Sequence, residues 1–400
     1  KTLGIPLFQE QAMKIAIVGA GFSPAEADAL RRALATFKRF GDVHKFHERF
    51  MVGMLANGYE QDFAERCFRQ IEGFADYGFP ESHAASFALL VYVSSWLKYH
   101  YPAAFACALL NSQPMGFYAP AQIVRDARDH GVVVHPPDVN HSDWDCTLEG
   151  AALRLGLRQI KGVGETDIDV LVKMRQVQTD GFTAIAQMGR TGIGRNLLER
   201  LARADAFNSL GLDRRAALWN VRALEDIPPL PLLTGDGNGP AAEKTPTQLP
   251  LMPLGEQVID DYRTMRLSLK AHPLALLRDQ LTEDGYGACE QLAKTPDGAA
   301  IQVAGLVITR QRPGSAKGVM FVTLEDETGV ANLVVWQKVF EAHRSAALGA
   351  SLMGVQGHLQ REGQVIHVVA NTITDESWRL ARLDTSGSAA SLNLTSRDFH

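Results

Sequence analysis

The sequence predicts an α+β protein of several modules, mostly helical as far as about residue 225 and rich in strands from about residue 299. Three observations predict this fold class. Apolar residues recur at helical spacing through most of the first 225 residues, two short glycine-containing loops join helical segments, and the apolar period changes to two after residue 300. The length of 400 residues favours about two to four domains.

Residues 1–150 form a predicted helical region. Segments with a 3.6-residue apolar period cover residues 9–18, 24–37, 61–72 and 82–101. Ser82 is the predicted N-cap of the last helix, and Pro102 ends it. A further helix is expected near residues 120–130, and an extended stretch and a short hairpin at Glu149-Gly150 follow.

The most specific motif of the helical half is the loop Lys161-Gly162-Val163-Gly164, which follows Ile160. Its pattern, apolar-x-Gly-apolar-Gly, is typical of the loop in a helix-hairpin-helix motif. Glycine lets the backbone approach a phosphate closely, and the helix that follows presents free N–H groups and the positive end of its dipole. Such contacts carry no base-sequence information. The alternative is an ordinary glycine-containing turn between two helices.

A weaker second copy of this motif is Gly192-Ile193-Gly194-Arg195. It precedes an apolar stripe at helical spacing, formed by Leu197, Leu198, Leu201 and Ala202. Residues 151–225 are therefore expected to form a tandem unit that binds duplex DNA. This segment contains 12 Lys and Arg against 8 Asp and Glu, whereas the whole chain has a net charge of −5. The positive charge is thus concentrated here, as a phosphate-binding face requires.

Composition excludes several other classes of protein. The cysteines are far apart and form no CxxC pair: Cys67, Cys107, Cys146 and Cys289. This spacing disfavours a zinc site or a disulfide framework, and we expect a cytoplasmic protein with no bound metal. The longest apolar run, residues 84–97, is too short to span a bilayer. The chain opens directly in a helical pattern at Lys1, without a signal peptide, and we expect it to be part of a longer protein.

Residues 226–298 are expected to form a linker with a short helical segment, since 7 of the 18 prolines fall between residues 227 and 253. The linker contains a peptide similar to the sliding-clamp pentapeptide Q-L-x-L-F, with Met in place of the terminal Phe. The residues expected to contact a clamp are Gln248, Leu249, Leu251 and Met252. The alternatives are a plain linker, or a clamp reached mainly through a partner protein.

Residues 299–375 predict a five-stranded barrel of the oligonucleotide-binding (OB) type, with a helix at about residues 338–347 between the third and fourth strands. Any other small β-barrel is the alternative. Residues 376–400 are expected to be a flexible tail. Basic and aromatic residues on the barrel are typical of a face that binds single-stranded DNA: Arg310, Arg312, Lys317, Trp336 and Arg361. Phe321 is assigned to the core. A protein contact is a rival role, because the barrel is nearly neutral.

The segment Gly78-Phe79-Pro80-Glu81-Ser82-His83-Ala84 resembles a signature of bacterial C-family DNA polymerases, the polymerase III alpha subunits. Other segments recur in the same order in that family: Phe8-Gln9-Glu10-Gln11, Ala29-Leu30-Arg31-Arg32, Trp96-Leu97-Lys98-Tyr99-His100, Pro136-Pro137-Asp138-Val139-Asn140 and Ala271-His272-Pro273-Leu274. The resemblance implies that residues 1–150 are the C-terminal part of the polymerase fingers. It further implies the error-prone, ImuC-type branch, which acts in translesion synthesis with ImuB-type and ImuA-type partners.

The same resemblance implies roles for individual residues. Nucleotide contacts in the fingers fall on Arg31, Arg32, Ser82 and His83. The palm carboxylates that hold two Mg²⁺ ions are expected before Lys1, so this chain alone should bind no Mg²⁺ and should not polymerise DNA. Two alternatives stay open, a truncated replicative alpha subunit and a non-catalytic DNA-binding scaffold of hairpins and barrel.

Overall fold

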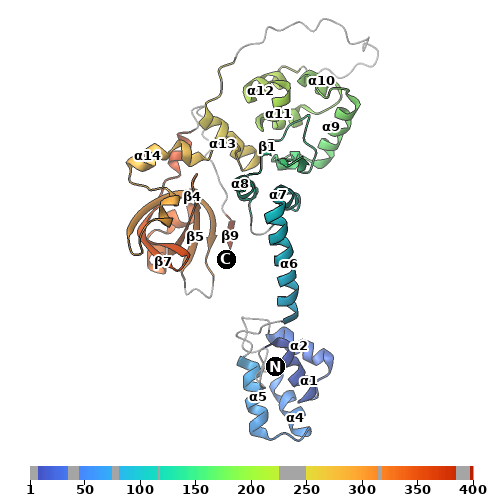
Figure 1. Ribbon diagram of the computed structural model, residues 1–400, viewed down its shortest axis with the longest axis vertical. Coiled ribbons are helices and arrows are strands. Elements are labelled where there is room, and N and C mark those ends of the chain that lie inside the picture. The colour runs from blue at the N-terminus through green and yellow to red at the C-terminus, as the bar shows by residue number, and fades with distance from the viewer. Residues whose placement is uncertain are drawn as a thin grey trace. The chain divides into compact units, whose positions relative to one another are not determined.

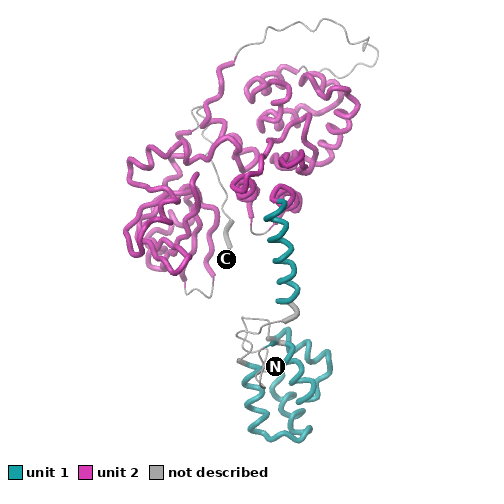
Figure 2. Tube along the Cα trace, viewed as in Figure 1, with its two compact units in different colours: residues 1–101 teal, residues 102–400 magenta. Residues whose placement is uncertain are grey.

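The computed structural model describes residues 8–34, 45–73, 81–115, 118–224, 249–313, 318–383 and 397–399. The chain divides into two compact units, Lys1–Tyr101 and Pro102–His400 (Figure 2). In the described residues, the first unit consists of helices, and the second combines helices with a β-barrel (Figure 1). The predicted α+β class is confirmed.

The described part of the first unit consists of α1 (Gln9–Val18), α2 (Pro24–Leu34), α4 (His47–Ala56), α5 (Gln61–Gly73) and α6 (Glu81–His100). Its core includes Leu30, Phe50 and Phe68. The sequence did not predict α4, because a glycine inside a helix lowers the helix propensity. The structure explains Gly53 by packing, since a Cβ atom there would lie 1.8 Å from the carbonyl oxygen of Ala20.

α6 differs from its predicted form at its N-terminal end. It begins at Glu81, so Ser82 lies inside the first turn and is not the N-cap. Pro102 follows its end, as predicted, and is also the first residue of α7 (Pro102–Asn111). Proline suits this position because the first N–H of a helix has no intrahelical acceptor.

The second unit opens with α7, α8 (Pro120–Asp129) and a small sheet. In that sheet β3 (Ala152–Arg154) pairs parallel with β1 (Val134–His135) and antiparallel with β2 (Thr147–Glu149). The β2–β3 hairpin lies where the sequence predicts it. Residues of α7, α8 and this sheet share one hydrophobic core with the hairpin helices. A boundary near residue 150 is therefore not visible in the packing.

Two hairpins follow, and α12 (Arg214–Arg222) packs against the helices of the second. The first joins the 3₁₀ turn η1 (Leu157–Gln159) to α9 (Glu165–Val177), and the second joins α10 (Ile185–Arg190) to α11 (Arg195–Arg203). Leu171 of α9 and Leu198 and Leu201 of α11 are fully buried in the shared core. We call residues 102–224 the hairpin module.

Much of the predicted linker forms helices. From residue 249 it contains α13 (Leu254–Met265), η3 (Pro273–Leu276), α14 (Arg278–Glu283) and η4 (Cys289–Ala293). Arg214 of α12 is buried, donates to the carbonyl oxygen of Gln257 and pairs with Asp261. α13 therefore packs back onto the hairpin module. Residues 226–248 of the predicted linker lie outside the described residues.

The barrel consists of β4 (Ala300–Gln311), β5 (Met320–Glu325), β6 (Val330–Val335), β7 (Leu352–Glu362) and β8 (Val365–Asp375). The strand order is β5-β6-β8-β7-β4, and pairing of β4 with β5 closes the barrel. The helices α15 (Gln337–Ala342) and α16 (Arg344–Gly349) lie between the third and fourth strands in sequence. The predicted five-stranded barrel with its helical insertion is confirmed.

The predicted tail is partly ordered. Within it, α17 (Trp378–Ala381) places Leu380 in a core with Ile259 and Leu274. The short strand β9 (Arg397–Phe399) pairs parallel with β4. Residues 384–396 and 400 lie outside the described residues.

Candidate nucleic-acid interface

The two hairpins have the same backbone geometry. In the first, Gly162 has φ +79° and Gly164 is the extended N-cap of α9. In the second, Gly192 has φ +87° and Gly194 is the extended N-cap of α11. Glycine adopts a positive φ at little cost, which explains the first glycine of each loop. The predicted helix-hairpin-helix pair is confirmed.

Each loop turns its apolar residue inward and its glycines outward. Ile193 is 5% exposed and belongs to the core, and Val163 packs against the same core. Gly162, Gly192 and Gly194 are exposed. The helix that starts after each loop presents N–H groups without intrahelical acceptors, and its dipole places a partial positive charge there. Both loops can therefore receive a phosphate oxygen.

The two hairpins differ in charge. The first turn of α9 carries Glu165 and Asp167, and carboxylates at this position repel an approaching phosphate. The first turn of α11 contains no acidic residue and begins with Arg195. Arg195 donates to the carbonyl oxygen of Arg222 at 2.8 Å, which fixes its guanidinium at the helix start. The second hairpin, the weaker copy by sequence, is the better anion site by charge.

Sequence reasoning missed Arg200, which lies on α11. A Cβ atom on Gly162 would lie 1.8 Å from Nη1 of Arg200, so this side chain packs directly on the first loop. A residue of the second hairpin thus reaches the loop of the first. No local pattern signals this contact, because it depends on how the two hairpins pack.

On the barrel, two of the predicted arginines serve the fold. Arg310 is 6% exposed and donates to the carbonyl oxygens of Ala347 and Ala350. Arg361 donates through Nη2 to three carbonyl oxygens near η4, those of Leu292, Ala293 and Thr295. Their guanidinium groups are engaged internally, so we leave both out of the proposed interface.

The other predicted barrel residues lie at the surface or outside the described residues. Trp336 is 55% exposed, directly after β6. Arg312 packs over the ring of Phe340, with 4.5 Å between its Cζ and the ring centroid. Phe321 is 37% exposed, so its assignment to the core was wrong. Met320 and Val322 on either side of it are buried, so the alternation of the strand places Phe321 on the outward face. Lys317 is not described.

The predicted nucleotide-contacting arginines lie in the last turn of α2. Arg31 and Arg32 both pair with Asp28, at 2.9 and 3.1 Å, and both side chains remain substantially exposed. Ser82 and His83 lie in the first turn of α6, and their side chains are outside the described residues.

The predicted clamp peptide is anchored by its backbone. Nη1 of Arg215 donates to the carbonyl oxygen of Pro250 at 2.9 Å, and Nε2 of Gln257 donates to that of Met252 at 2.7 Å. The side chain of Leu251 is 82% exposed, whereas Leu249 and Met252 are half-buried. Gln248 lies outside the described residues.

The acidic residues beside the hairpins hold the fold together. Burial alone would raise the pKa of the Asp138 carboxyl, but hydrogen bonds from Ser209, Asn140 and His141 hold that pKa below its ordinary value. Asp143 and Asp145 form ion pairs with Arg175 and Arg158, respectively. Across the described ranges, no group of three or more His, Cys, Asp or Glu is arranged to hold a metal ion.

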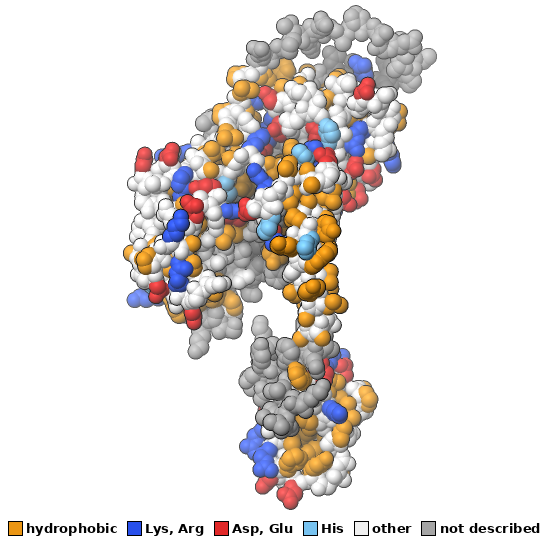
Figure 3. Space-filling view, viewed as in Figure 1, with side chains coloured by type: hydrophobic (Ala, Val, Ile, Leu, Met, Phe, Trp, Pro, Cys, Tyr) orange, Lys and Arg blue, Asp and Glu red, His pale blue; other side chains and the backbone are white. Residues whose placement is uncertain are grey.

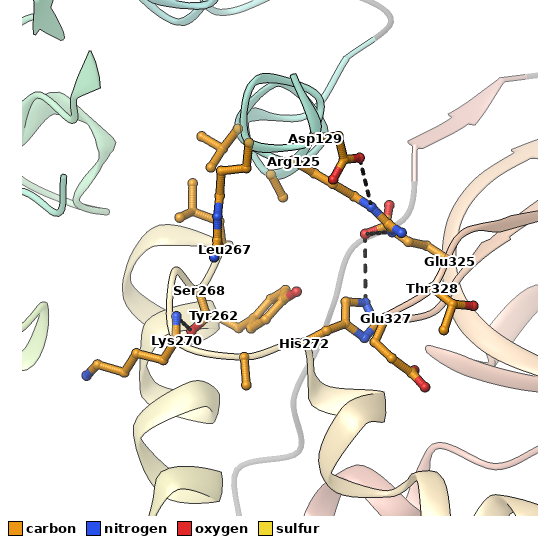
Figure 4. A pocket seen from close by; sticks show the side chains of 14 residues that line it. Arg125, Asp129, Tyr262, Leu267, Ser268, Lys270, His272, Glu325, Glu327 and Thr328 are labelled. Atoms are coloured by element: carbon orange, nitrogen blue, oxygen red, sulfur yellow. Dashed lines mark hydrogen bonds and ion pairs between the residues drawn. The ribbon is translucent and has the colours of Figure 1, made fainter. Parts of the chain in front are cut away.

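A cavity of about 590 Å³ lies where the hairpin module meets the barrel (Figure 4). Arg125 of α8 pairs with Glu325 at 3.2 Å and contacts Asp129 at 3.9 Å. Nε2 of His272 is buried and 3.7 Å from Glu325, too far for a hydrogen bond, and no other described residue provides a hydrogen-bond partner for it. Burial lowers the pKa of His272 to about 4, so the ring is neutral at pH 7. We assign this cluster to the junction between the two modules.

α6 exposes large apolar side chains along its length. Leu89, Tyr92 and Tyr99 are 65%, 70% and 80% exposed. Figure 3 shows hydrophobic side chains gathered over this helix. In the part of the chain that the structure covers, no helix combines the length and the apolar character needed to cross a membrane.

Three family models match this chain. The bacterial DNA polymerase III alpha subunit finger domain matches residues 1–58, the helix-hairpin-helix motif matches residues 131–217, and the OB-fold nucleic acid binding domain matches residues 301–376. Their order along the chain agrees with the order of the structural parts.

Relatives cover almost the whole chain. The error-prone DNA polymerase of Sinorhizobium medicae is 54% identical over 94% of this chain and 36% of its own length. Those of Ruegeria pomeroyi and Caulobacter vibrioides are 55% and 50% identical over 96% and 100% of this chain, and over 35% and 40% of their own lengths. The chain thus spans a little over a third of the length of these relatives, and over that span it is similar to error-prone DNA polymerases.

Proposed function

We propose that the chain is the C-terminal part of an error-prone DNA polymerase, and that its tandem hairpins hold duplex DNA by the sugar–phosphate backbone. The observation that carries this proposal is the repeated loop geometry. Two glycine loops and two helix N-termini are fixed in one hydrophobic core, so they can contact two positions along one duplex. Contacts of this kind are independent of base sequence, as a polymerase requires.

The second hairpin should contribute more of the binding free energy than the first. Its loop is sterically open, since a Cβ atom on Gly192 or Gly194 would meet no atom within 4 Å. Its helix start also carries a guanidinium instead of carboxylates. A phosphate at this site gains from the helix dipole and from Arg195 together.

Gly194→Val tests the proposal. Gly194 has φ −62°, which valine tolerates, so the substitution adds bulk at the helix start without backbone strain. We expect weaker binding of labelled duplexes, to a similar extent for unrelated sequences, in a fluorescence anisotropy titration. Gly349→Val, at an equally open position on the barrel, is the matched control. Equal affinity of both variants and the unmodified chain would overturn the proposal.

The roles of the other parts are also proposals. The finger-domain match over residues 1–58 supports a fingers role for the first unit, with Arg31 and Arg32 near the incoming nucleotide. We propose the same role for Ser82 and His83 from the motif resemblance of residues 78–84. The apolar surface of α6 supports packing of this unit against other parts of a complete polymerase. The described residues offer no ligand cluster for Mg²⁺, so catalytic Mg²⁺ in a complete enzyme requires carboxylates elsewhere. We expect the purified chain to bind DNA without extending a primer.

Contacts with partner proteins are proposed for residues 248–252. The exposed side chain of Leu251 beside anchored carbonyl groups supports a weak contact of residues 248–252 with the sliding clamp. Replacement of Leu251 by Ala should abolish such binding in a pull-down, and Met252→Phe should strengthen it. ImuB-type and ImuA-type proteins are proposed partners through the family relationship alone.

On the barrel, Trp336 and Phe321 are exposed aromatic side chains. Phe321 pairs across the strands with Gln311, the residue before Arg312, and Trp336 follows Val335, which pairs with Met320. Aromatic rings of this kind stack with bases of single-stranded DNA. We therefore propose single-stranded template DNA as the ligand of this face, with a protein partner as the outcome if no such binding is measured.

A further inference from the structure

Arg200 occupies an unusual position for a side chain of its charge. It lies in the second turn of α11, yet its guanidinium packs on Gly162 of the other hairpin. The first loop tolerates this contact only because residue 162 has no side chain. A Cβ atom would lie 1.8 Å from Nη1 and 3.0 Å from Cζ of Arg200. Gly162 therefore serves two purposes, the left-handed backbone and the approach of this guanidinium.

Arg200 differs from the other half-buried or buried arginines of residues 151–224. Those arginines are each within 4.0 Å of a carboxylate: Arg154, Arg158, Arg175, Arg195, Arg214 and Arg215. Within the described ranges, Nε of Arg200 donates a hydrogen bond to the side-chain oxygen of Asn196 at 3.3 Å. Its terminal nitrogens meet no carboxylate there, although the side chain is half-buried.

A partly exposed guanidinium without a carboxylate partner can bind an anion through its terminal N–H groups. The first hairpin also lacks positive charge at the start of its helix, and Arg200 supplies it. Glu165 and Asp167 oppose the dipole of α9, so this loop needs positive charge beside it to receive a phosphate. Lys161 is exposed at the loop, and Arg200 lies directly on it.

We propose that Arg200 is a phosphate ligand of the first hairpin, supplied by the helix of the second. The two hairpins then form one composite site, in which α11 serves two phosphates. Its N-terminus, with Arg195, binds one, and Arg200, one turn further along, binds another above Gly162. A guanidinium suits this role because its N–H groups match two oxygens of one phosphate. This inference rests on the proposed binding of duplex DNA.

The test is the salt dependence of duplex binding by the whole chain. Each phosphate contact contributes a slope of about −0.9 to log K against log salt concentration. Arg200→Gln removes the charge and keeps a polar, though shorter, side chain, and we expect it to reduce the slope by about 0.9. Arg200→Lys keeps the charge, so we expect an unchanged slope with weaker binding. Lys173→Ala, which removes an exposed charge near the C-terminal end of α9, is the matched control and should leave the slope unchanged.

The possible outcomes separate the two proposals. If the unmodified chain shows no salt-dependent duplex binding, or if Gly194→Val binds normally, the proposed function fails. If the chain binds DNA and Gly194→Val weakens it, but Arg200→Gln keeps the full slope, Arg200 only packs on the loop and this inference is overturned. A thermal melting curve of each variant identifies a loss of folding, and a folded Arg200→Lys variant with a reduced slope would also contradict the inference.

Discussion

The hairpin module and the barrel both carry arginines, but they use them differently. In the barrel, Arg310 and Arg361 donate to main-chain carbonyl groups and hold strands against neighbouring helices. In the hairpin module, Arg195 and Arg200 lie at the two loops that face solvent. The two regions differ in where the guanidinium lies, since Arg195 and Arg200 are at exposed loops although each also has an internal hydrogen bond, whereas Arg310 is buried in the barrel.

The largest expected effect of a substitution is on the barrel. Arg310→Ala leaves the carbonyl oxygens of Ala347 and Ala350 without their donor in a buried place. We expect the free energy of unfolding to fall by about 3 kcal/mol, with duplex affinity unchanged while the chain is folded. Urea denaturation measures the first quantity and anisotropy the second. A stable variant that loses duplex binding would reverse the comparison.

The two loops should respond differently to alanine. Gly192→Ala should cost about 1–2 kcal/mol of folding free energy, because its φ is positive but its surroundings are open. Gly162→Ala should cost about 1 kcal/mol more, because Arg200 must also move. Urea denaturation of both variants, repeated with Arg200→Ala, checks the reason. The extra cost should disappear in the double variant, and a constant difference would exclude the contact as its cause.

The junction between the modules should weaken in acid. The pKa of His272 is about 4 in the folded chain and about 6.5 when unfolded, so between these values the unfolded state binds more protons. Stability should therefore fall as the pH decreases from 7 to 5, by at most about 2 kcal/mol. Arg125, Arg278, Asp326 and Glu327 also act on this ring. Glu325, whose pKa is raised by burial, contributes the opposite slope.

His272→Asn separates these contributions. Asparagine does not titrate, and it can still accept the hydrogen bond that His272 receives from the N–H of Leu274. Urea denaturation at pH 7 and pH 5 should show less acid destabilisation in this variant than in the unmodified chain. An identical pH dependence would mean that His272 does not control the junction.

The smallest effect on stability is expected at Trp336. Since its side chain is exposed, Trp336→Ala should change the folding free energy by about 0.5 kcal/mol or less. Affinity for single-stranded DNA should fall by about 1–3 kcal/mol if one base stacks on the ring. Tryptophan fluorescence quenching and anisotropy measure this binding. Unchanged affinity would favour a protein as the partner of the barrel face.

Several elements follow from local sequence. The apolar period predicted α1, α5 and the five strands because side chains on one face of a helix or strand recur at a fixed interval. The pattern failed at α4, where Gly53 is retained for a close contact with Ala20, and at α7, where Pro102 was taken only as the end of a helix. A residue placed for a distant contact, or for the next element, does not show its purpose in its neighbours.

The sequence by itself determined the hairpin loops, because their glycines are required by backbone conformation at Gly162 and Gly192. It also determined the barrel and the resemblance to error-prone DNA polymerases. Only the tertiary structure decided which arginines remain available to bind a phosphate. Arg310 and Arg361 are engaged by carbonyl groups, and Arg200 reaches a loop 38 positions earlier in the chain, through packing of two hairpins. Burial and hydrogen bonding depend on neighbours distant in sequence, so no local pattern distinguishes a structural arginine from a phosphate ligand.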